Sequence, residues 1–327
     1  MPEAPGEKEV SPLRKIRRLS VILLLLVLLL SGCGSPEPSG SGTQLRQISS
    51  AVSEREDFTP YAAPPLATVA FHPELAEGND EVKLDLSSAA EGYVAVSARS
   101  DKRLKFQVLM GEWTYTYNIA SDGSPSFFPL QCGNGEYTFR VMENISASKY
   151  VQIYRAVHEI VLLDEFQPFL RPSDYSKYDA DSACVKKAAE LASACSNRLE
   201  VVSAVYAFVC RQIRYDAKKA ETVQSGYLPD VDETLRSGKG ICFDYAALAA
   251  AMLRSQGIPT KIIFGYVAPN NLYHAWNMFY TEESGWVTVS FEVDDRSWNR
   301  IDLTFSAGGA GEEFTGDGSN YTDVYSY

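Results

Sequence analysis

One cysteine of the sequence stands where the start of a helix could activate it. Cys242 follows a loop with two glycines and precedes residues 246–254, a run without Pro, Gly or β-branched residues that stops at Gly257. We expect a helix here, with Asp244 in its first turn, where the helix dipole favours a carboxylate. Because unpaired N–H groups at a helix start favour a thiolate, this position predicts a lowered pKa and a nucleophilic Cys242. The alternative is a small buried apolar residue, as most free cysteines are.

Two residues downstream supply the partners that a cysteine nucleophile needs. His274 lies in an apolar run, and Asp302 lies in a second run that contains tryptophan. In acyl transfer by a thiol, an imidazole exchanges a proton with the sulfur, and a third group fixes the tautomer of the imidazole. Asp302 is the candidate for that third group. Asp294 and Asp295 are rivals, although Asp-Asp-Arg between apolar runs is also typical of a turn.

Five short patterns, in this order, resemble the transglutaminase-like superfamily of cysteine acyltransferases and proteases. They are Gly-x-Cys-x-Asp-x-Ala at 240–246, Met-Leu-Arg-x-x-Gly-Ile-Pro at 252–259, Gly-Tyr at 265–266, His-Ala-Trp-Asn at 274–277 and Trp-x-x-Ile-Asp-x-Thr-Phe at 298–305. The resemblance covers about residues 200–310 and implies that Cys242, His274 and Asp302 are the catalytic residues. The sequence departs from the family at Ser290, near the place where members often have the aspartate, and at Leu303, which replaces a proline.

The resemblance implies covalent catalysis at an amide bond. The Cys242 thiolate attacks the carbonyl carbon, His274 protonates the departing amine, and Asp302 orients and stabilises the imidazolium. The backbone N–H of Cys242 contributes to an oxyanion hole. Water then resolves the thioester in a protease or amidase, and a lysine amine resolves it in a cross-linking transglutaminase; the sequence leaves both open. We expect no cofactor, and no calcium-loop pattern favours a calcium-dependent cross-linker.

The competing hypothesis is a catalytically inactive adhesion or scaffold lipoprotein that keeps the transglutaminase-like fold. The altered aspartate segment and the long β-rich region before the motifs favour it. The composition limits the expected partners under both hypotheses. The net charge is −12, and no basic patch or stripe is visible, so nucleic acid is not an expected partner. No Cys-x-x-Cys or Cys/His cluster indicates a metal. The expected partner of an enzyme is a protein or peptide substrate at the cell surface.

Residues 1–33 have the pattern of a bacterial lipoprotein signal. Basic residues precede the apolar run 21–30, which is too short to span a bilayer but has the length of a signal h-region. The run ends in Leu-Ser-Gly-Cys33, and the resemblance implies that Cys33 is lipidated and becomes the new N-terminus. An ordinary signal peptide with a chance cysteine is the alternative. Residues 34–57 are expected to be a disordered linker. The folded part would then be lipid-anchored at the extracytoplasmic face of the bacterial cell membrane.

Residues 58–165 have the pattern of an antiparallel β-sandwich or barrel. Short runs with alternating residues are separated by turn signals such as Asp122-Gly123. The predicted strands cover residues 82–86, 93–98, 104–109, 114–119, 137–141 and 150–154. His72 and His158 are lone histidines, and each is expected to be a surface or packing residue, because metal sites need clustered ligands.

Residues 166–310 are expected to form an α+β, papain-like core in which helices pack on an antiparallel sheet. The predicted elements are helices over 182–194 and 200–213, then the cysteine helix, then strands over 260–267, 274–280 and 286–293, with Asp302 on a fourth strand. Neighbouring antiparallel strands would place His274 beside Asp302. The acidic tail, 311–327, could add one edge strand.

The two helices before the nucleophile raise two smaller questions. Asp181 or Ser182 could cap the first helix. Cys184 and Cys195 would lie about 16 Å apart on one continuous helix, too far for a disulfide. A bridge from Cys184 to Cys210 across an antiparallel helix pair is conceivable; otherwise these residues are small buried thiols.

Overall fold

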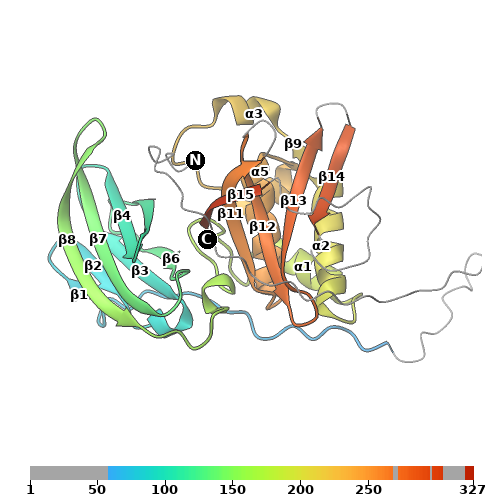
Figure 1. Cartoon of the computed structure of the whole chain (residues 1–327), viewed down its shortest axis with the longest axis horizontal. Helices are drawn as coiled ribbons and strands as arrows, with labels where there is room; N and C mark the ends of the chain where they lie inside the picture. Colours follow the sequence, from blue (N-terminus) through green and yellow to red (C-terminus); the bar gives the residue numbers. More distant parts are fainter. Residues whose placement is uncertain (1–57, 268–271, 295–296, 305–320) are drawn as a thin grey trace, which may run out of the picture. The chain divides into compact units, whose positions relative to one another are not determined.

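The computed structural model describes residues 58–267, 272–294, 297–304 and 321–327. The expected signal segment, Cys33 and the linker lie outside the described residues, and so does Asp295. One compact unit spans Pro60–Tyr327. It contains two four-stranded sheets and, further along the chain, helices that accompany a five-stranded sheet (Figure 1).

Strands β1–β8 form two antiparallel sheets. One has the order β1-β2-β3-β6 and the other β5-β4-β7-β8. The strands are β1 (Glu77–Gly78), β2 (Val82–Asp85), β3 (Tyr93–Ala98), β4 (Leu104–Met110), β5 (Trp113–Ile119), β6 (Ser126–Pro129), β7 (Gly135–Ser146) and β8 (Lys149–Ile160). Two 3-10 helices accompany them, η1 (Ala89–Glu91) and η2 (Gln167–Phe169).

The inner faces of these two sheets share one apolar core. Val94, Phe106 and Phe139 are fully buried, and the ring of Phe106 on β4 lies 5.3 Å from the ring of Phe128 on β6, in the other sheet. Because one side of each strand packs inward and the other faces outward, the sequence shows the alternation from which a sandwich was predicted, and that prediction is confirmed. β6 escaped prediction because Ser-Phe-Phe-Pro is a short run without alternation.

Along the chain, the helices follow the sandwich and precede the last sheet. They are α1 (Ala183–Ala192), α2 (Arg198–Gln212), α3 (Ala217–Thr222), α4 (Val231–Ser237) and α5 (Cys242–Ser255), with the two-residue strands β9 (Arg214–Tyr215) and β10 (Lys239–Gly240) among them. The predictions of α1, α2 and the cysteine helix are confirmed within a few residues. The short helices α3 and α4 were not predicted, because six or seven residues are too few to show a helical period.

The start of α1 is satisfied by a residue distant in the sequence. Ser182 is the N-cap, but its side chain makes no capping hydrogen bond. Instead, the carboxylate of Asp232, at the start of α4, accepts hydrogen bonds from the backbone N–H groups of Ala183 (2.9 Å) and Cys184 (3.0 Å). A carboxylate at this end also interacts favourably with the helix dipole. The contact ties α1 to the helix that leads into the nucleophile loop.

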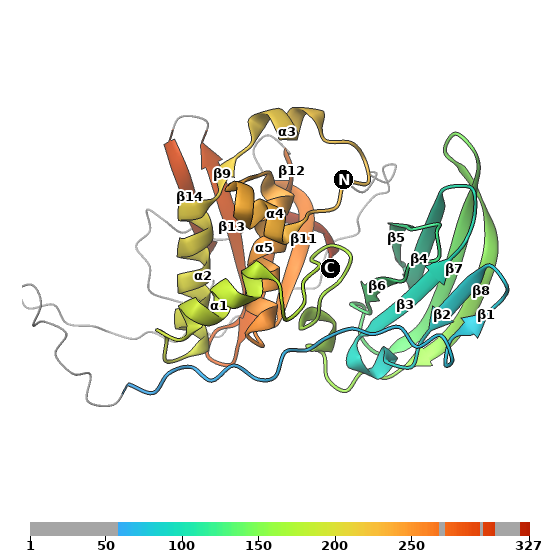
Figure 2. The same cartoon turned by 180° about the vertical axis from the view of Figure 1, so that it is seen from behind.

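The last sheet is antiparallel and has the order β14-β13-β12-β11-β15. Its strands are β11 (Thr260–Val267), β12 (Leu272–Thr281), β13 (Gly285–Asp294), β14 (Ser297–Thr304) and β15 (Tyr321–Ser326). Helices α1, α2 and α5 lie on one side of β11–β14, behind the sheet in Figure 1 and in front of it in Figure 2. This arrangement confirms the α+β class, with helices on an antiparallel sheet.

Helix α5 is buried along its whole length. Every residue from Cys242 to Ser255 is buried, so the helix is a core element rather than an amphipathic surface helix. Its only guanidinium, Arg254, is satisfied by backbone oxygens: it donates from Nε to Thr260 (2.8 Å) and from Nη2 to Tyr327 (3.0 Å). Burial lowers the pKa of Arg254 to about 10. The rigid placement of α5 fixes the position of its first residue, Cys242.

The described cysteines are all free thiols, so the conceivable Cys184–Cys210 bridge is not formed. Burial raises the pKa of Cys184, and it raises the pKa of Cys210 to about 12. Both residues therefore behave as small buried thiols. No helix within the described residues is long and apolar enough to cross a membrane.

Candidate active site

Helix α5 begins at Cys242, and the residues just before it are bonded to its first turn. Ile241 is the N-cap, and its backbone N–H donates to the carboxylate of Asp244 at 2.8 Å. A Cβ atom on Gly240 would lie 2.6 Å from the Cβ of Asp244. The glycine is therefore required by the close approach of Asp244, which in turn holds the N-terminal turn of α5.

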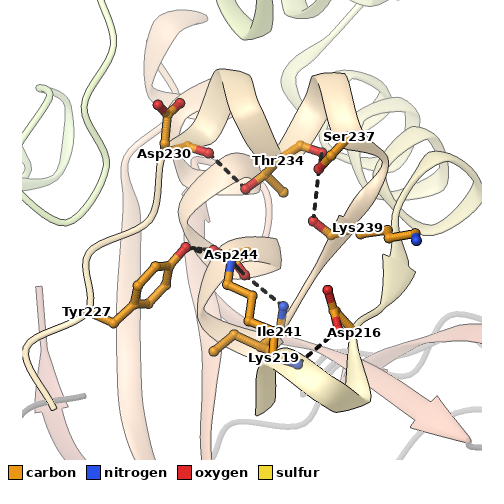
Figure 3. A network of polar contacts seen from close by, with 9 residues as sticks. All are labelled: Asp216, Lys219, Tyr227, Asp230, Thr234, Ser237, Lys239, Ile241 and Asp244. Atoms are coloured by element: carbon orange, nitrogen blue, oxygen red, sulfur yellow. Dashed lines mark hydrogen bonds and ion pairs between the residues drawn. The ribbon is translucent and has the colours of Figure 1, made fainter. Parts of the chain in front are cut away.

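Asp244 is the centre of a buried polar network. Its side chain is fully buried and accepts hydrogen bonds from the Lys219 ammonium (2.6 Å) and from the Tyr227 hydroxyl (2.5 Å). The ammonium of Lys219 also donates to the Tyr227 oxygen at 2.7 Å. Figure 3 shows both side chains pointing at the carboxylate, above the Ile241 backbone. Burial of a carboxylate without such partners would cost free energy. The bonds from Lys219 and Tyr227 offset this cost for Asp244.

The segment that supplies Lys219 is itself fixed to the nucleophile loop. Strand β9 pairs in parallel with β10, with Arg214 opposite Lys239 and Tyr215 opposite Gly240. Asp216 then caps α3 by accepting from the backbone N–H of Lys219 at 2.9 Å. Sequence reasoning found Asp244 but missed Lys219 and Tyr227. The signal available was a carboxylate within an alanine-rich, buried helix, which demands a cation or hydroxyl partner, but the sequence does not say which one.

The thiol of Cys242 is buried, with 7% of the residue exposed. Burial raises its pKa to about 11, and the carboxylate of Asp244 acts in the same direction. Backbone N–H groups of Ala275, Phe243 and Cys242 itself offset part of this rise. The predicted lowering of the pKa is therefore wrong for this structure, because the loss of hydration outweighs the helix-start N–H groups. At neutral pH Cys242 is a thiol that needs a base.

His274 lies on β12, the strand that contacts the nucleophile. The Ala275 N–H that lowers the pKa of Cys242 belongs to the next residue. The pairing of β12 with β13 runs from Thr281↔Gly285 to Asn277↔Val289, so the first residues of β12 extend past this ladder. The His274 ring is half-buried, 6.4 Å from the ring of Trp276. The structure therefore brings together the cysteine and histidine segments.

Asn277 locks β12 onto α5. Its fully buried side chain donates from Nδ2 to the backbone oxygens of Ala246 (3.0 Å) and Lys261 (3.1 Å). The first bond crosses to α5 one turn after Cys242, and the second reaches β11. The last residue of the His-Ala-Trp-Asn pattern thus fixes the distance between the strand that carries His274 and the helix that carries Cys242.

The structure corrects the expected neighbourhood of Asp302. This residue lies on β14, but β13 separates β14 from β12. The register partner of Asp302 is Ser290 of β13. Since the two faces of a sheet alternate along each strand, the registers put positions 274, 290 and 302 on one face of the sheet. The rival Asp294 ends β13, opposite Ser297. By register Asp302 thus shares a face with His274, but it does not lie on the neighbouring strand.

A cavity of about 420 Å³ lies elsewhere on the sheet. Its lining includes Lys261, Ile263 and Met278, which alternate along β11 and β12 with the residues that face α5. Cys242 is not among the described residues that line it. Among the described residues, no group of three His, Cys, Asp or Glu side chains could hold a metal ion.

Comparison with solved structures gives similar proteins of low identity. A candidate cysteine protease of Cytophaga hutchinsonii is 16% identical, with a TM-score of 0.35, over 59% of this chain and 68% of that one. The periplasmic domain of TgpA from Pseudomonas aeruginosa is 17% identical, with a TM-score of 0.33, over 65% and 93%. Red sea bream transglutaminase is 13% identical, with a TM-score of 0.27, over 61% and 48%.

A search of curated protein sequences gives no match. The sequence model of the transglutaminase-like superfamily matches residues 185–291. This range runs from α1 to the middle of β13 and contains both Cys242 and His274. Residues 185–291 are therefore similar to the transglutaminase-like superfamily.

Proposed function

We propose that the protein is a cysteine enzyme that acts on amide bonds of protein or peptide substrates through a thioester. The observation that carries this proposal is the contact between the start of α5 and β12: the Cys242 thiol lies beside the backbone N–H of Ala275, next to His274. A cysteine at a helix start beside a histidine is the arrangement that thiol acyl transfer requires.

The raised pKa of Cys242 determines how the first step proceeds. His274 removes the proton of the Sγ–H group as the sulfur attacks the substrate carbonyl carbon. The backbone N–H of Cys242, at the first position of α5, donates to the oxyanion that develops. His274 then gives its proton to the departing amine, and the C–N bond breaks to leave the thioester. Asp302, at a position on the same face of the sheet as His274, orients the imidazole and stabilises its protonated form.

The second step is the attack of water or of an amine on the thioester carbonyl. His274 accepts a proton from the attacking group, the C–S bond breaks, and the sulfur regains a proton. Water as the acceptor makes the protein a protease or amidase, and a lysine side chain makes it a cross-linking transglutaminase. We further propose that lipidation of Cys33 anchors the enzyme at the extracytoplasmic face of the bacterial membrane.

The acceptor and the nucleophile are tested together. The protein is incubated with casein and a fluorescent primary amine, and both peptide release and amine incorporation are followed. Peptide release or amine incorporation that disappears in Cys242→Ser but persists in Cys184→Ser supports the proposal and identifies the acceptor. Activity that persists in Cys242→Ser would contradict it. For the anchor, incorporation of a clickable fatty acid should be lost in Cys33→Ala.

A second candidate function is an inactive adhesion or scaffold lipoprotein. Two observations favour it: Cys242 is only 7% exposed, and β13 separates the strands of His274 and Asp302. If cells carrying Cys242→Ala keep every phenotype that deletion of the protein removes, the scaffold function replaces the enzyme.

A further inference from the structure

The network at the start of α5 contains the one charge pair that the described residues show within a turn of the nucleophile. Asp244 is two residues after Cys242, fully buried, and paired with the ammonium of Lys219 at 2.6 Å. Lys219 comes from α3, whereas Asp244 comes from α5. The side chain of Lys219 is 30% exposed, so a substitution at this position can remove the cation without leaving a cavity in the core.

The sign of each charge has a defined effect on the sulfur. A carboxylate close to a thiol disfavours the thiolate, and the charge of Asp244 acts on Cys242 in this direction. The ammonium of Lys219 has the opposite sign and bonds directly to the same carboxylate, so the pair presents little net charge to Cys242. Removal of either member would leave the other uncompensated beside the sulfur.

Other groups around the sulfur and the carboxylate do not replace Lys219. Tyr215 on β9 and Tyr273 on β12 interact electrostatically with Cys242, and burial raises the pKa of both phenols, so they are neutral near pH 8. Tyr227 donates to Asp244, and burial and the carboxylates of Asp244 and Asp230 raise its pKa, so it contributes a hydrogen bond without a charge. His274, one residue before Ala275 on β12, is part of the proposed reaction.

We propose that Lys219 is a positioning residue that tunes the reactivity of Cys242 through Asp244. Its ammonium offsets the carboxylate that holds the first turn of α5, so that the carboxylate can anchor the Ile241 backbone without suppressing ionisation of the neighbouring thiol. Tyr227 keeps the carboxylate in place. This role deepens the proposed function and rests on Cys242 being the nucleophile.

Labelling of Cys242 by iodoacetamide at pH 8.5, read for each cysteine by mass spectrometry, tests the role without a substrate. Below the pKa of the thiol, the labelling rate is proportional to the thiolate fraction, so a change of one pKa unit is a tenfold change in rate. We expect Lys219→Gln to slow the labelling of Cys242 by roughly three- to tenfold and Asp244→Asn to accelerate it. Lys219→Arg should keep the rate of the unaltered protein.

Lys218→Gln is the matched control, because it removes the same charge from the preceding, exposed residue of α3; it should leave the rate unchanged. Each variant is first shown to be folded by circular dichroism. Equal rates in Lys219→Gln and the unaltered protein would overturn the inference, and so would a folded Asp244→Asn that labels more slowly. A slowing in Lys218→Gln equal to that in Lys219→Gln would overturn it as well.

The same variants in a His274→Ala background separate this inference from the proposed function. The opposite effects of Lys219→Gln and Asp244→Asn should persist there, because they act on the thiolate and not on the base. If they persist while His274→Ala itself changes nothing, the charge pair acts as inferred but the proposed catalytic pair is wrong. If His274→Ala slows labelling and the two charge variants have no effect, only the inference about Lys219 fails.

Discussion

The two halves of the proposed site are held by different kinds of structure. The cysteine half is fixed by side chains: Asp244 bonds to Ile241 and Lys219, and Asn277 bonds to the backbone of α5. The half that contains the candidate third group is fixed by strand register. The register sets Asp302 opposite Ser290, on a strand that does not pair with β12. The nucleophile therefore depends on local packing, whereas the role of Asp302 depends on how the sheet is ordered.

Replacement of the nucleophile should lower kcat more than any other substitution in the two halves of the site. Cys242→Ser should reduce kcat on casein by roughly 10⁴-fold or more, because the covalent route is lost. The same exchange at the buried Cys184 should leave kcat close to its original value. Rates of peptide release and amine incorporation give the result, and comparable losses in both variants would mean that the assay reports folding rather than chemistry.

Replacement of the third group tests the other half. Asp302→Asn should reduce kcat by about 10³-fold, since the imidazole loses the carboxylate that orients it. Ser290→Ala, at its register partner, should cost less than about tenfold. Asp294→Asn, at the end of β13, is the control and should have little effect. A larger loss in Ser290→Ala than in Asp302→Asn would move the third group onto β13.

Asn277→Ala should loosen the contact between β12 and α5. The substitution removes hydrogen bonds to two backbone oxygens from a fully buried site, so we expect a loss of about 2 kcal/mol in the free energy of unfolding. The midpoint of urea denaturation measures it. Asn118→Ala, at an exposed position of β5, should change the midpoint little; an equal shift in both variants would show that Asn277 has no special role.

Asp232→Ala should have the smallest effect. It removes the carboxylate that accepts from the first N–H groups of α1, and loss of such a cap costs about 1 kcal/mol. Thermal unfolding followed at 222 nm reports this loss. Asp181→Ala removes a fully exposed carboxylate next to the same helix end and should leave the stability nearly unchanged. A greater loss of stability in Asp181→Ala than in Asp232→Ala would show that Asp232 is not the residue that caps α1.

The particular residues explain what the sequence could and could not predict. Strands such as β3 and β11 were predicted at their observed ends, because alternation and flanking turns are local signals. The proximity of Cys242 and the His274 segment followed from ordered motifs. The strand order that separates His274 from Asp302 could not be predicted, since the sequence gives strands but not their neighbours. The raised pKa of Cys242 depends on burial by residues distant in the chain.

The central claim is that His274 is the base of a buried thiol. It is tested most directly by the rate of Cys242 alkylation between pH 6 and pH 10, in the unaltered protein and in His274→Ala. Since burial raises the thiol pKa to about 11, the thiolate alone would give a rate that rises about tenfold with each pH unit over this range. We predict an additional component near neutral pH that His274→Ala removes, which leaves only this alkaline rise. Superimposable profiles in the two proteins would contradict the claim.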